Sequence, residues 1–216
     1  MNRRDFAGQL IGGGAALALA GTSVTAQAQG PAEGTHYVRL QTPAPVSAAA
    51  NKIEVVEFFW YECPHCNTLE PLLEGWIKKL PADVSFRAVP VGFTPRHQVG
   101  QKLFYTLEEM GQLEAMHKRV FAAIHVQRRR MSTDADVLAF VKDQGVDAKR
   151  FEDIYKSFQV NTKATRARQL SDAYKLDGVP ALGIQGRFWT SPALAGGYDR
   201  SLAVTDFLIQ RARNRS

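Results

Sequence analysis

The stretch Lys52–Trp76 reads KIEVVEFFWYECPHCNTLEPLLEGW, and it decides how the rest of the chain folds. Its first part, Ile53–Trp60, is an almost continuous run of β-branched and aromatic residues, which predicts a buried central strand. The run leads into Cys63-Pro64-His65-Cys66 and then into apolar residues at helical spacing. Pro64 suits the first position of a helix, because the N–H that it lacks would have no partner there. We therefore expect a strand, a short connection and a helix that begins at the cysteines.

The two cysteines are the only ones in the 216-residue chain, and their spacing indicates redox chemistry. Cys63 would lie at the N-cap, where free backbone N–H groups and the positive end of the helix dipole favour a thiolate. Cys66 follows one turn later and lies close enough to form a disulfide with Cys63. This placement makes Cys63 the expected nucleophile and Cys66 its resolving partner.

Two other interpretations of the cysteine pair are less favoured. A structural disulfide here would close a very short loop, so its entropic stabilisation would be slight. A structural zinc site normally has four ligands, and no further cysteine is present. The remaining histidines lack the spacing of a zinc knuckle; they are His36, His97, His117 and His125. We therefore expect no metal.

Glu57 interrupts the apolar strand. A carboxylate in such a run is costly unless it is paired, hydrogen-bonded or protonated. One possibility is that its side chain reaches an edge or solvent, since strand side chains alternate between faces. The other is a buried acid near the cysteines that can relay protons.

Residues 1–28 have the pattern of a cleaved export signal. Arg3-Arg4 precede an apolar segment, Leu10–Ala20, and Ala26-Gln27-Ala28 matches an A-x-A cleavage site. The arginine pair fits both the twin-arginine and the general secretory route, so the route stays open. An uncleaved membrane anchor is the alternative, although the apolar segment is short for a bilayer span. Export would place the protein in the periplasm, where disulfide chemistry is permitted.

The net charge of +6 does not indicate a nucleic-acid-binding protein. The basic residues are concentrated only in one short run, Arg128-Arg129-Arg130, whereas a nucleic-acid footprint needs a wider basic face. Such a run is more typical of a solvated helix end. We therefore expect no nucleic-acid partner.

Strand patterns flank a long helical segment. Val84–Val91 alternates in the manner of a strand, and Tyr37–Leu40 is a candidate edge strand. Further on, Gly178–Ile184 and Arg187–Trp189 predict a hairpin joined by the turn Gln185-Gly186.

Between these strands the apolar residues recur only at helical spacing, which predicts five helices. Three of these helices are expected to start at Ser132 or Thr133, at Asp147 and at Asn161. Phe158 is expected on the apolar face of the helix that Asp147 caps. Asp199 is expected to cap the last helix of the chain. These patterns predict an α/β domain made of residues 29–95 and 176–216. An all-helical insertion would occupy residues 96–175.

The chain resembles the DsbA family of periplasmic thiol–disulfide oxidoreductases. The resemblance rests on Glu57-Phe58-Phe59, on Cys63-Pro64-His65-Cys66 three residues later, and on Gly178-Val179-Pro180-Ala181. It covers nearly the whole chain after the leader, and the Pro-His pair between the cysteines is its most specific part. The resemblance implies a thioredoxin-like fold with an inserted all-helical domain.

The resemblance also implies roles for particular residues. Cys63 would be the exposed attacking cysteine, Cys66 the buried one, and His65 would help to keep Cys63 as a thiolate. Val179-Pro180 would be a cis peptide bond that faces the cysteines and pairs with the substrate backbone, and Pro64 and Glu57 would support the site. In some relatives a lysine on the next strand approaches the acid. Here Ala88 takes that position, and Arg87 would point to the opposite face.

The resemblance favours a protein disulfide oxidase that donates its Cys63–Cys66 disulfide to exported proteins with free thiols. A DsbB-like, quinone-linked protein of the inner membrane would reoxidise it, and the enzyme would be a monomer without a cofactor. Two alternatives remain open: a disulfide reductase or isomerase, and a chaperone-like peptide-binding protein.

Overall fold

The computed structural model describes residues 30–214, and the export signal expected over residues 1–28 lies outside this range. The described part contains one five-stranded sheet with the strand order β1-β5-β4-β2-β3. The strands are β1 (Val38–Arg39), β2 (Ile53–Phe59), β3 (Val84–Pro90), β4 (Ala181–Ile184) and β5 (Phe188–Thr190). Only β2 and β3 run parallel, joined through α1 (Pro64–Ile77); the other pairs are antiparallel.

Strand β2 lies inside the sheet because it carries apolar side chains on both faces, although Glu54 and Glu57 also belong to it. All seven of its residues are buried, and the strand pairs with β3 on one side and β4 on the other. The hairpin between β4 and β5 turns at Gln185 and Gly186, which have φ values of 50° and 62°. Two successive positive φ values match the tight turn that follows the twist of a hairpin. The candidate edge strand is confirmed as β1, which pairs only with β5.

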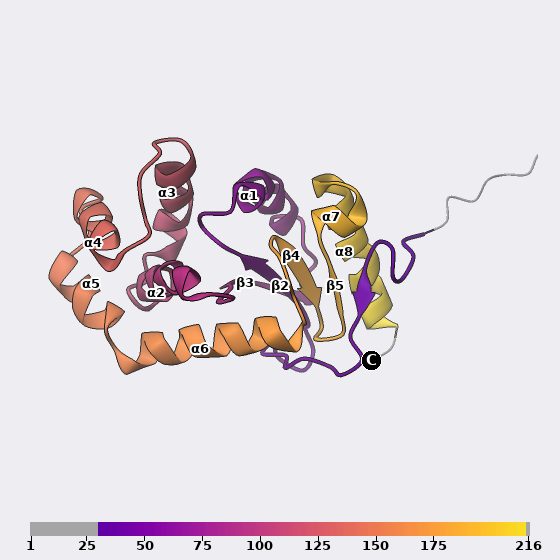
Figure 1. Ribbon diagram of the computed structural model, residues 1–216. Coiled ribbons are helices and arrows are strands. Elements are labelled where there is room, and N and C mark those ends of the chain that lie inside the picture. The colour runs from indigo at the N-terminus through magenta and orange to yellow at the C-terminus, as the bar shows by residue number, and fades with distance from the viewer. Residues whose placement is uncertain (1–29, 215–216) are drawn as a thin grey trace, which may run out of the picture. The chain divides into compact units, whose positions relative to one another are not determined.

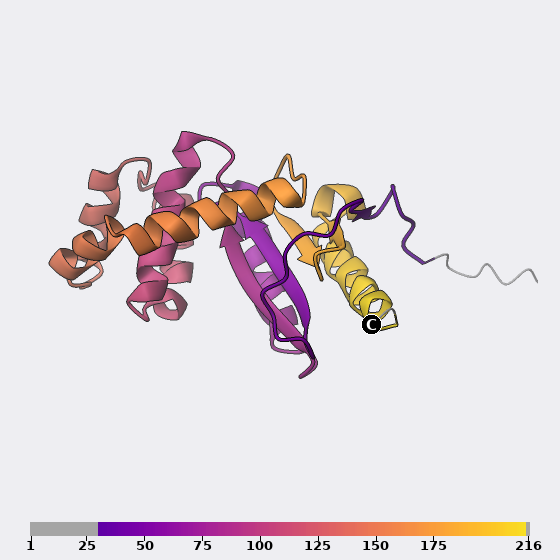
Figure 2. The same cartoon turned by 90° about the horizontal axis from the view of Figure 1, so that it is seen from below.

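Five helices follow β3 before the chain returns to the sheet: α2 (Pro95–Glu109), α3 (Leu113–His125), α4 (Asp134–Asp143), α5 (Ala148–Tyr155) and α6 (Phe158–Ala173). We call these helices and their connections the helical block. Helices α2 to α5 form a group beside the sheet, and α6 runs along this group back to the sheet (Figures 1 and 2). Its end is fixed there, since the ring of Tyr174 packs against Phe58 of β2 at a centroid distance of 5.0 Å.

The last two helices are α7 (Pro192–Ala195) and α8 (Tyr198–Arg213). Helix α8 packs on the sheet and beside α1. Leu69 and Leu73 of α1, Leu182 of β4 and Leu202 of α8 form one buried cluster. This cluster holds the cysteine-bearing helix on the sheet.

Several helix starts differ from those expected. Thr133 and Asp147 cap α4 and α5 as expected, but α6 is capped by Ser157 and already includes Phe158. Phe158 is 86% exposed, so its placement on the apolar face of the preceding helix was wrong. Gly197 rather than Asp199 is the N-cap of α8, and Asp199 lies in the first turn. An acidic residue is favourable at either position, because both lie at the positive end of the helix.

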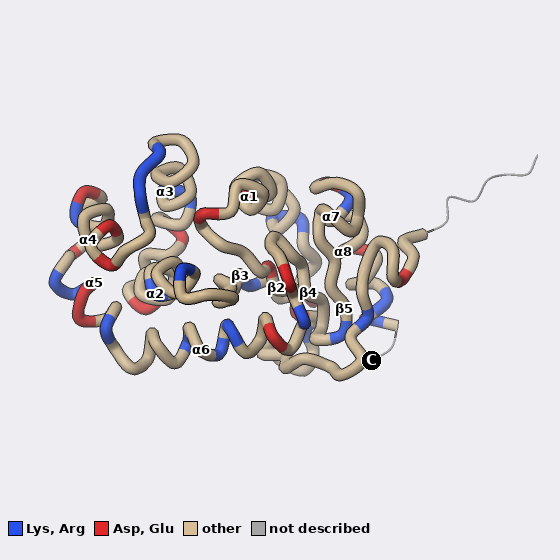
Figure 3. The backbone as a smooth tube through the Cα atoms, viewed as in Figure 1, with Lys and Arg blue, Asp and Glu red and all other residues tan. Residues whose placement is uncertain are grey.

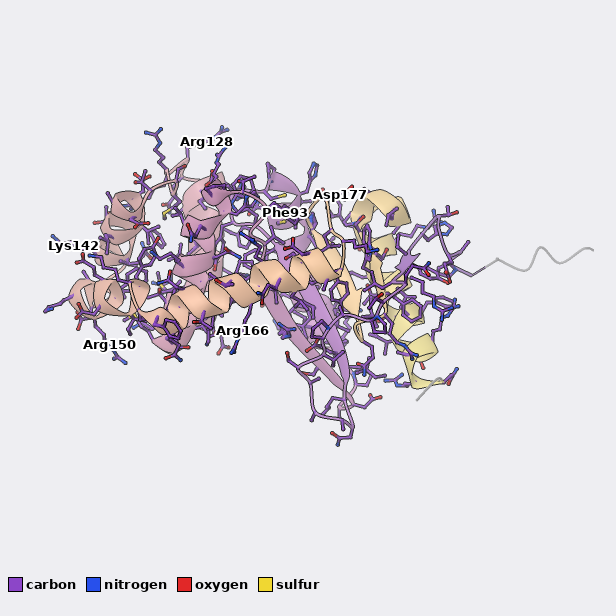
Figure 4. The ribbon with its side chains drawn as sticks, turned by 60° about the horizontal axis from the view of Figure 1, so that its bottom comes forward. Phe93, Arg128, Lys142, Arg150, Arg166 and Asp177 are labelled. Atoms are coloured by element: carbon purple, nitrogen blue, oxygen red, sulfur yellow. The ribbon has the colours of Figure 1, made fainter. Side chains whose placement is uncertain are left out.

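Charged side chains cover the outside of the helical block. Lysines and arginines are spread along its helices and in the connection after α3 (Figure 3). Arg128, Lys142, Arg150 and Arg166 extend away from the protein in different directions (Figure 4). Among residues 30–214, no helix is both long enough and apolar enough to cross a bilayer.

Candidate active site

The two cysteines lie where the sequence predicts, at the start of α1. Cys63 is the N-cap with extended backbone angles, and Pro64 is the first helical residue. Both cysteines are free thiols. Cys66 is completely buried, while Cys63 keeps 7% of its surface exposed. Cys63 is therefore the more accessible of the two, although it is far less exposed than the resemblance implies.

The two thiols differ in how they ionise. The pKa of Cys63 is lowered to about 6, first because the Cys66 thiol donates a hydrogen bond to it. Backbone N–H groups of Cys66 and His65 and the charge of His65 add to this effect, while burial opposes it. Burial, together with Cys63 itself, raises the pKa of Cys66. The pair therefore holds a thiolate on Cys63 and a proton on Cys66 at neutral pH.

The residues before β4 face the Cys63 sulfur. The Val179–Pro180 peptide bond is cis, as the resemblance implies. The Cys63 Sγ lies 3.5 Å from the carbonyl oxygen of Val179. A cavity of about 550 Å³ opens beside this contact, and its lining includes Pro180, Trp189 and Leu194.

His65 and Tyr198 border the same cavity. The Nδ1 atom of His65 lies 2.9 Å from the Tyr198 hydroxyl, at the start of α8. The side chain of His65, two residues after Cys63 in the sequence, is therefore held in the wall of the cavity.

Glu57 is buried, which excludes the possibility that it reaches an edge or solvent. The residue is 1% exposed, and its Oε1 atom has no hydrogen-bond partner among the described residues. Burial, and then the charge of Glu70, raises its pKa well above the usual value. Ala88 pairs with Glu57 across the strands, so no basic side chain occupies that position. Arg87 points to the other face as expected and forms an ion pair with Glu54 at 3.0 Å.

The sequence did not reveal how the helical block holds the residues just before Cys63. The His97 ring packs on Trp60 at a centroid distance of 4.5 Å. His117 Nδ1 lies 2.8 Å from the Tyr61 hydroxyl, and His125 Nε2 lies 2.8 Å from the Tyr61 carbonyl oxygen. These histidines are far from the cysteines in sequence, so no local pattern pointed to this role.

A metal site would need several ligands close together. Within residues 30–214, no group of three or more histidine, cysteine, aspartate or glutamate side chains could hold a metal ion.

Comparisons with known proteins decide the family. A model of the DSBA-like thioredoxin domain matches residues 85–196. The thiol:disulfide interchange protein DsbA of Bordetella parapertussis is 41% identical over 200 residues, which are 92% of this chain and 95% of that protein. DsbA of Burkholderia cepacia is 38% identical over 199 residues, covering 92% and 94% of the two chains. The chain belongs to the DsbA family.

The fold agrees with this assignment. The crystal structure of Pseudomonas aeruginosa DsbA superimposes with a TM-score of 0.81 at 38% identity, covering 86% of this chain and 96% of that one. A DsbA structure from Xylella fastidiosa gives a TM-score of 0.79 at 27% identity, covering 85% and 98%. The prediction of a thioredoxin-like fold is confirmed, and the chain is a thiol:disulfide oxidoreductase.

Proposed function

We propose that this DsbA-family protein is a disulfide oxidase of the periplasm, which donates a Cys63–Cys66 disulfide to exported proteins. The observation that carries the proposal is the low pKa of Cys63, about 6, beside a neutral Cys66. A thiolate that is stable at neutral pH favours the reduced pair over the disulfide, because the free energy of the dithiol form is lowered. A disulfide of this kind tends to pass to other proteins.

The reaction then takes two exchange steps. A substrate thiolate attacks Cys63 Sγ, the Cys63–Cys66 bond breaks, and its electron pair passes to Cys66, which needs a proton because its pKa is raised. A second substrate thiolate attacks the substrate sulfur of the mixed disulfide. Cys63 leaves as a thiolate, and the substrate leaves with a disulfide. Substrate sulfur is oxidised and the enzyme disulfide is reduced by the same two electrons.

The geometry supports a role for Val179 and Pro180 in holding the substrate. The Val179 carbonyl oxygen lies 3.5 Å from Cys63 Sγ, so a chain that reaches the sulfur also comes close to this acceptor. A backbone N–H of an extended substrate can donate to it, as in strand addition. The adjoining cavity can take an apolar substrate side chain. His65 supports the thiolate through its charge and its backbone N–H. Pro64 supports the helix start, because it lacks the N–H that would have no partner at the first helical position.

Glu57 fits the role of the acid that serves Cys66. It is buried, it carries an unpartnered oxygen, and its charge acts on the Cys66 thiol. A carboxyl group whose pKa is raised by burial holds a proton that it can give to the leaving thiolate.

The remaining parts of the proposal concern organisation and partners. Residues 29–95 and 176–216 would form the thioredoxin-like domain, with residues 96–175 as its helical insertion and residues 1–28 as the export signal. Substrates would be unfolded exported proteins, and a DsbB-like membrane protein would restore the disulfide. The enzyme would act as a monomer.

The experiment that tests this proposal compares two activities of the purified protein. One assay follows oxidation of a dithiol peptide by the disulfide form, and the other follows reduction of insulin disulfides by the dithiol form with a supplied reductant. We expect stoichiometric peptide oxidation and slow insulin reduction. Rapid insulin reduction with poor peptide oxidation would identify a reductase instead.

A further inference from the structure

Two carboxyl groups, Glu57 of β2 and Glu70 of α1, line one cavity of about 750 Å³. Burial is the larger cause of the raised pKa of Glu57, and the negative charge of Glu70 raises it further. The proton that Glu57 holds matters for the proposed oxidase, on which this inference rests. A proton on Glu57 can serve Cys66, whereas an ionised Glu57 has none to give.

The hydrogen bonds of the two carboxyl groups are unequal. Glu70 Oε1 lies 3.1 Å from His117 Nε2, while Glu57 Oε1 has no partner among the described residues. Glu57 is 1% exposed, and the Glu70 side chain is 17% exposed. A hydrogen bond to the ionised form favours that form, and an unpaired buried oxygen disfavours it.

His117 makes a second contact that orients its ring. Its Nδ1 atom lies 2.8 Å from the Tyr61 hydroxyl. In the neutral ring with Nε2 protonated, Nδ1 accepts from Tyr61 and Nε2–H donates to Glu70. The contact with Tyr61 thus holds the ring so that Nε2 faces Glu70.

The other basic groups at the cavity already have partners. Lys78, Arg87 and Lys118 reach its wall, and the remaining carboxylates there are Glu74, Glu108 and Glu114. Lys78 and Lys118 pair with Glu74, and Arg87 pairs with Glu54. Glu108 accepts from Lys163. Among the described residues, His117 is the basic side chain that bonds to Glu70.

We propose that His117 is a positioning residue, which holds the Glu70 carboxylate at the cavity that Glu57 also lines and thereby helps Glu57 to keep the proton that serves Cys66. The helical block would thus take part in the redox reaction through α3, although His117 does not touch the reacting sulfurs. Loss of the Glu70 contact would let the Glu70 carboxylate turn away from Glu57, so that Glu57 would hold its proton less firmly and protonation of the Cys66 thiolate would slow.

The test uses two substitutions that separate the contacts of His117. An asparagine amide can reach the position of Nδ1 but not Glu70, so His117→Asn removes the donor to Glu70. A glutamine amide reaches the position of Nε2, so His117→Gln restores that donor. The readout is the titration of the Glu57 carboxyl carbon by NMR in the reduced protein, with the signal assigned by its loss in Glu57→Gln.

We expect the titration midpoint of Glu57 to fall by about one pH unit in His117→Asn, a tenfold change in its protonation equilibrium. In His117→Gln the midpoint should stay close to that of the wild type. The rate of peptide oxidation should fall about tenfold in the asparagine variant and recover in the glutamine variant. An unchanged midpoint in His117→Asn, or an equal fall in both variants, would overturn the inference.

Two further results keep the inference separate from folding and from the proposed function. If His117→Asn does not fold, nitrogen NMR of the wild type decides, since a protonated Nε2 supports the inference and an unprotonated Nε2 overturns it. If the wild type does not oxidise dithiol peptides, the proposed oxidase is wrong, and the titrations still decide whether His117 acts on the protonation of Glu57. Peptide oxidation with an unchanged Glu57 titration would retain the oxidase and reject the role of His117.

Discussion

Cys63 and Cys66 are one turn apart on the same helix, yet their surroundings give them opposite tendencies to ionise. Cys63 lies at the N-cap, where backbone N–H groups and the Cys66 thiol can donate to its sulfur. Cys66 lies inside the protein, where a charge would lose its hydration. The difference in roles therefore follows from position on the helix rather than from any difference in residue type.

The first prediction concerns selective reaction of the cysteines. In the reduced protein at pH 6.5, iodoacetamide should label Cys63 rapidly and leave Cys66 unlabelled, because only Cys63 is a thiolate with an exposed edge. Mass spectrometry of the labelled peptides measures this. Equal labelling of both cysteines would show that the roles are assigned wrongly.

The second prediction follows the same roles into catalysis. Cys63→Ser should abolish peptide oxidation, while Cys66→Ser should accumulate mixed disulfides with substrates, since no internal thiol then releases them. Non-reducing gels of each variant mixed with a disulfide-containing peptide distinguish the two, because the Cys63 thiolate attacks the peptide disulfide and releases one peptide thiol. Mixed disulfides in Cys63→Ser would contradict the assignment.

The third prediction ranks the causes of the low pKa of Cys63. The hydrogen bond from Cys66 is the largest cause and the charge of His65 is the smallest. Cys66→Ala should therefore raise the pKa of Cys63 more than His65→Ala does. Thiolate absorbance against pH in both variants measures the order, and a larger rise in His65→Ala would reverse the explanation.

At the scale of elements, some features could be predicted because local patterns determine them. The strand before the cysteines, the helix start at Cys63 and the hairpin around Gln185 and Gly186 all follow from short sequence signals. The position of Ala88 beside Glu57 was implied by the resemblance, since a lysine of the next strand approaches this acid in some relatives. These features needed no knowledge of the tertiary contacts.

Other features could not be predicted because they depend on contacts between distant segments. Ser157 and Asn161 are both acceptable helix starts, and only packing decides that α6 begins early and leaves Phe158 exposed. Cys63 is only 7% exposed, and this burial depends on Val179, which lies against it although it is more than a hundred residues away in the sequence. His117 contacts Tyr61 and Glu70, which lie 56 and 47 residues away in the sequence, so no local pattern reveals these contacts.

The fourth prediction tests the junction between α6 and the sheet. A Cβ atom added at Gly183 of β4 would lie 2.5 Å from the Tyr174 ring and 3.0 Å from the Phe58 ring. Gly183→Ala should therefore lower the free energy of unfolding by about 2 kcal/mol, through overpacking. Gly75→Ala is the matched control, because nothing lies within 4 Å of its added Cβ atom and alanine favours the helix. Chemical denaturation measures the free energy of unfolding of both variants. A Gly183→Ala variant as stable as Gly75→Ala would show that the junction is loosely packed.

At the scale of the whole molecule, the Cys63 thiolate links redox state to stability. The folded pKa is about 6 and that of an unperturbed thiol is 9.0, so folding favours the thiolate. This contribution to the stability of the reduced protein is fully present above pH 9 and is lost as pH falls through about 6. At pH 7 it amounts to about 1.4 kcal/mol. The disulfide form has no such contribution.

The fifth prediction is the pH dependence of that difference. The free energy of unfolding of the reduced form, relative to the oxidised form, should rise by about 2.5 kcal/mol between pH 5 and pH 8. Glu57 is buried in the reduced and in the oxidised protein alike, so its contribution to the difference in the free energy of unfolding largely cancels. The raised pKa of Cys66 opposes the trend only where an unfolded thiol begins to ionise, near pH 9. Denaturation of both redox forms across this range measures the slope, and a difference independent of pH would mean that Cys63 is protonated in the folded protein.

The central claim is that the Cys63–Cys66 pair is an oxidant, and its equilibrium with glutathione at pH 7 tests that claim most directly. Fluorescence or thiol trapping at a series of ratios of reduced to oxidised glutathione gives the equilibrium constant. The account predicts that glutathione reduces the pair readily, with a reduction potential less negative than about −200 mV. A potential more negative than about −270 mV, in the range of disulfide reductases, would contradict it.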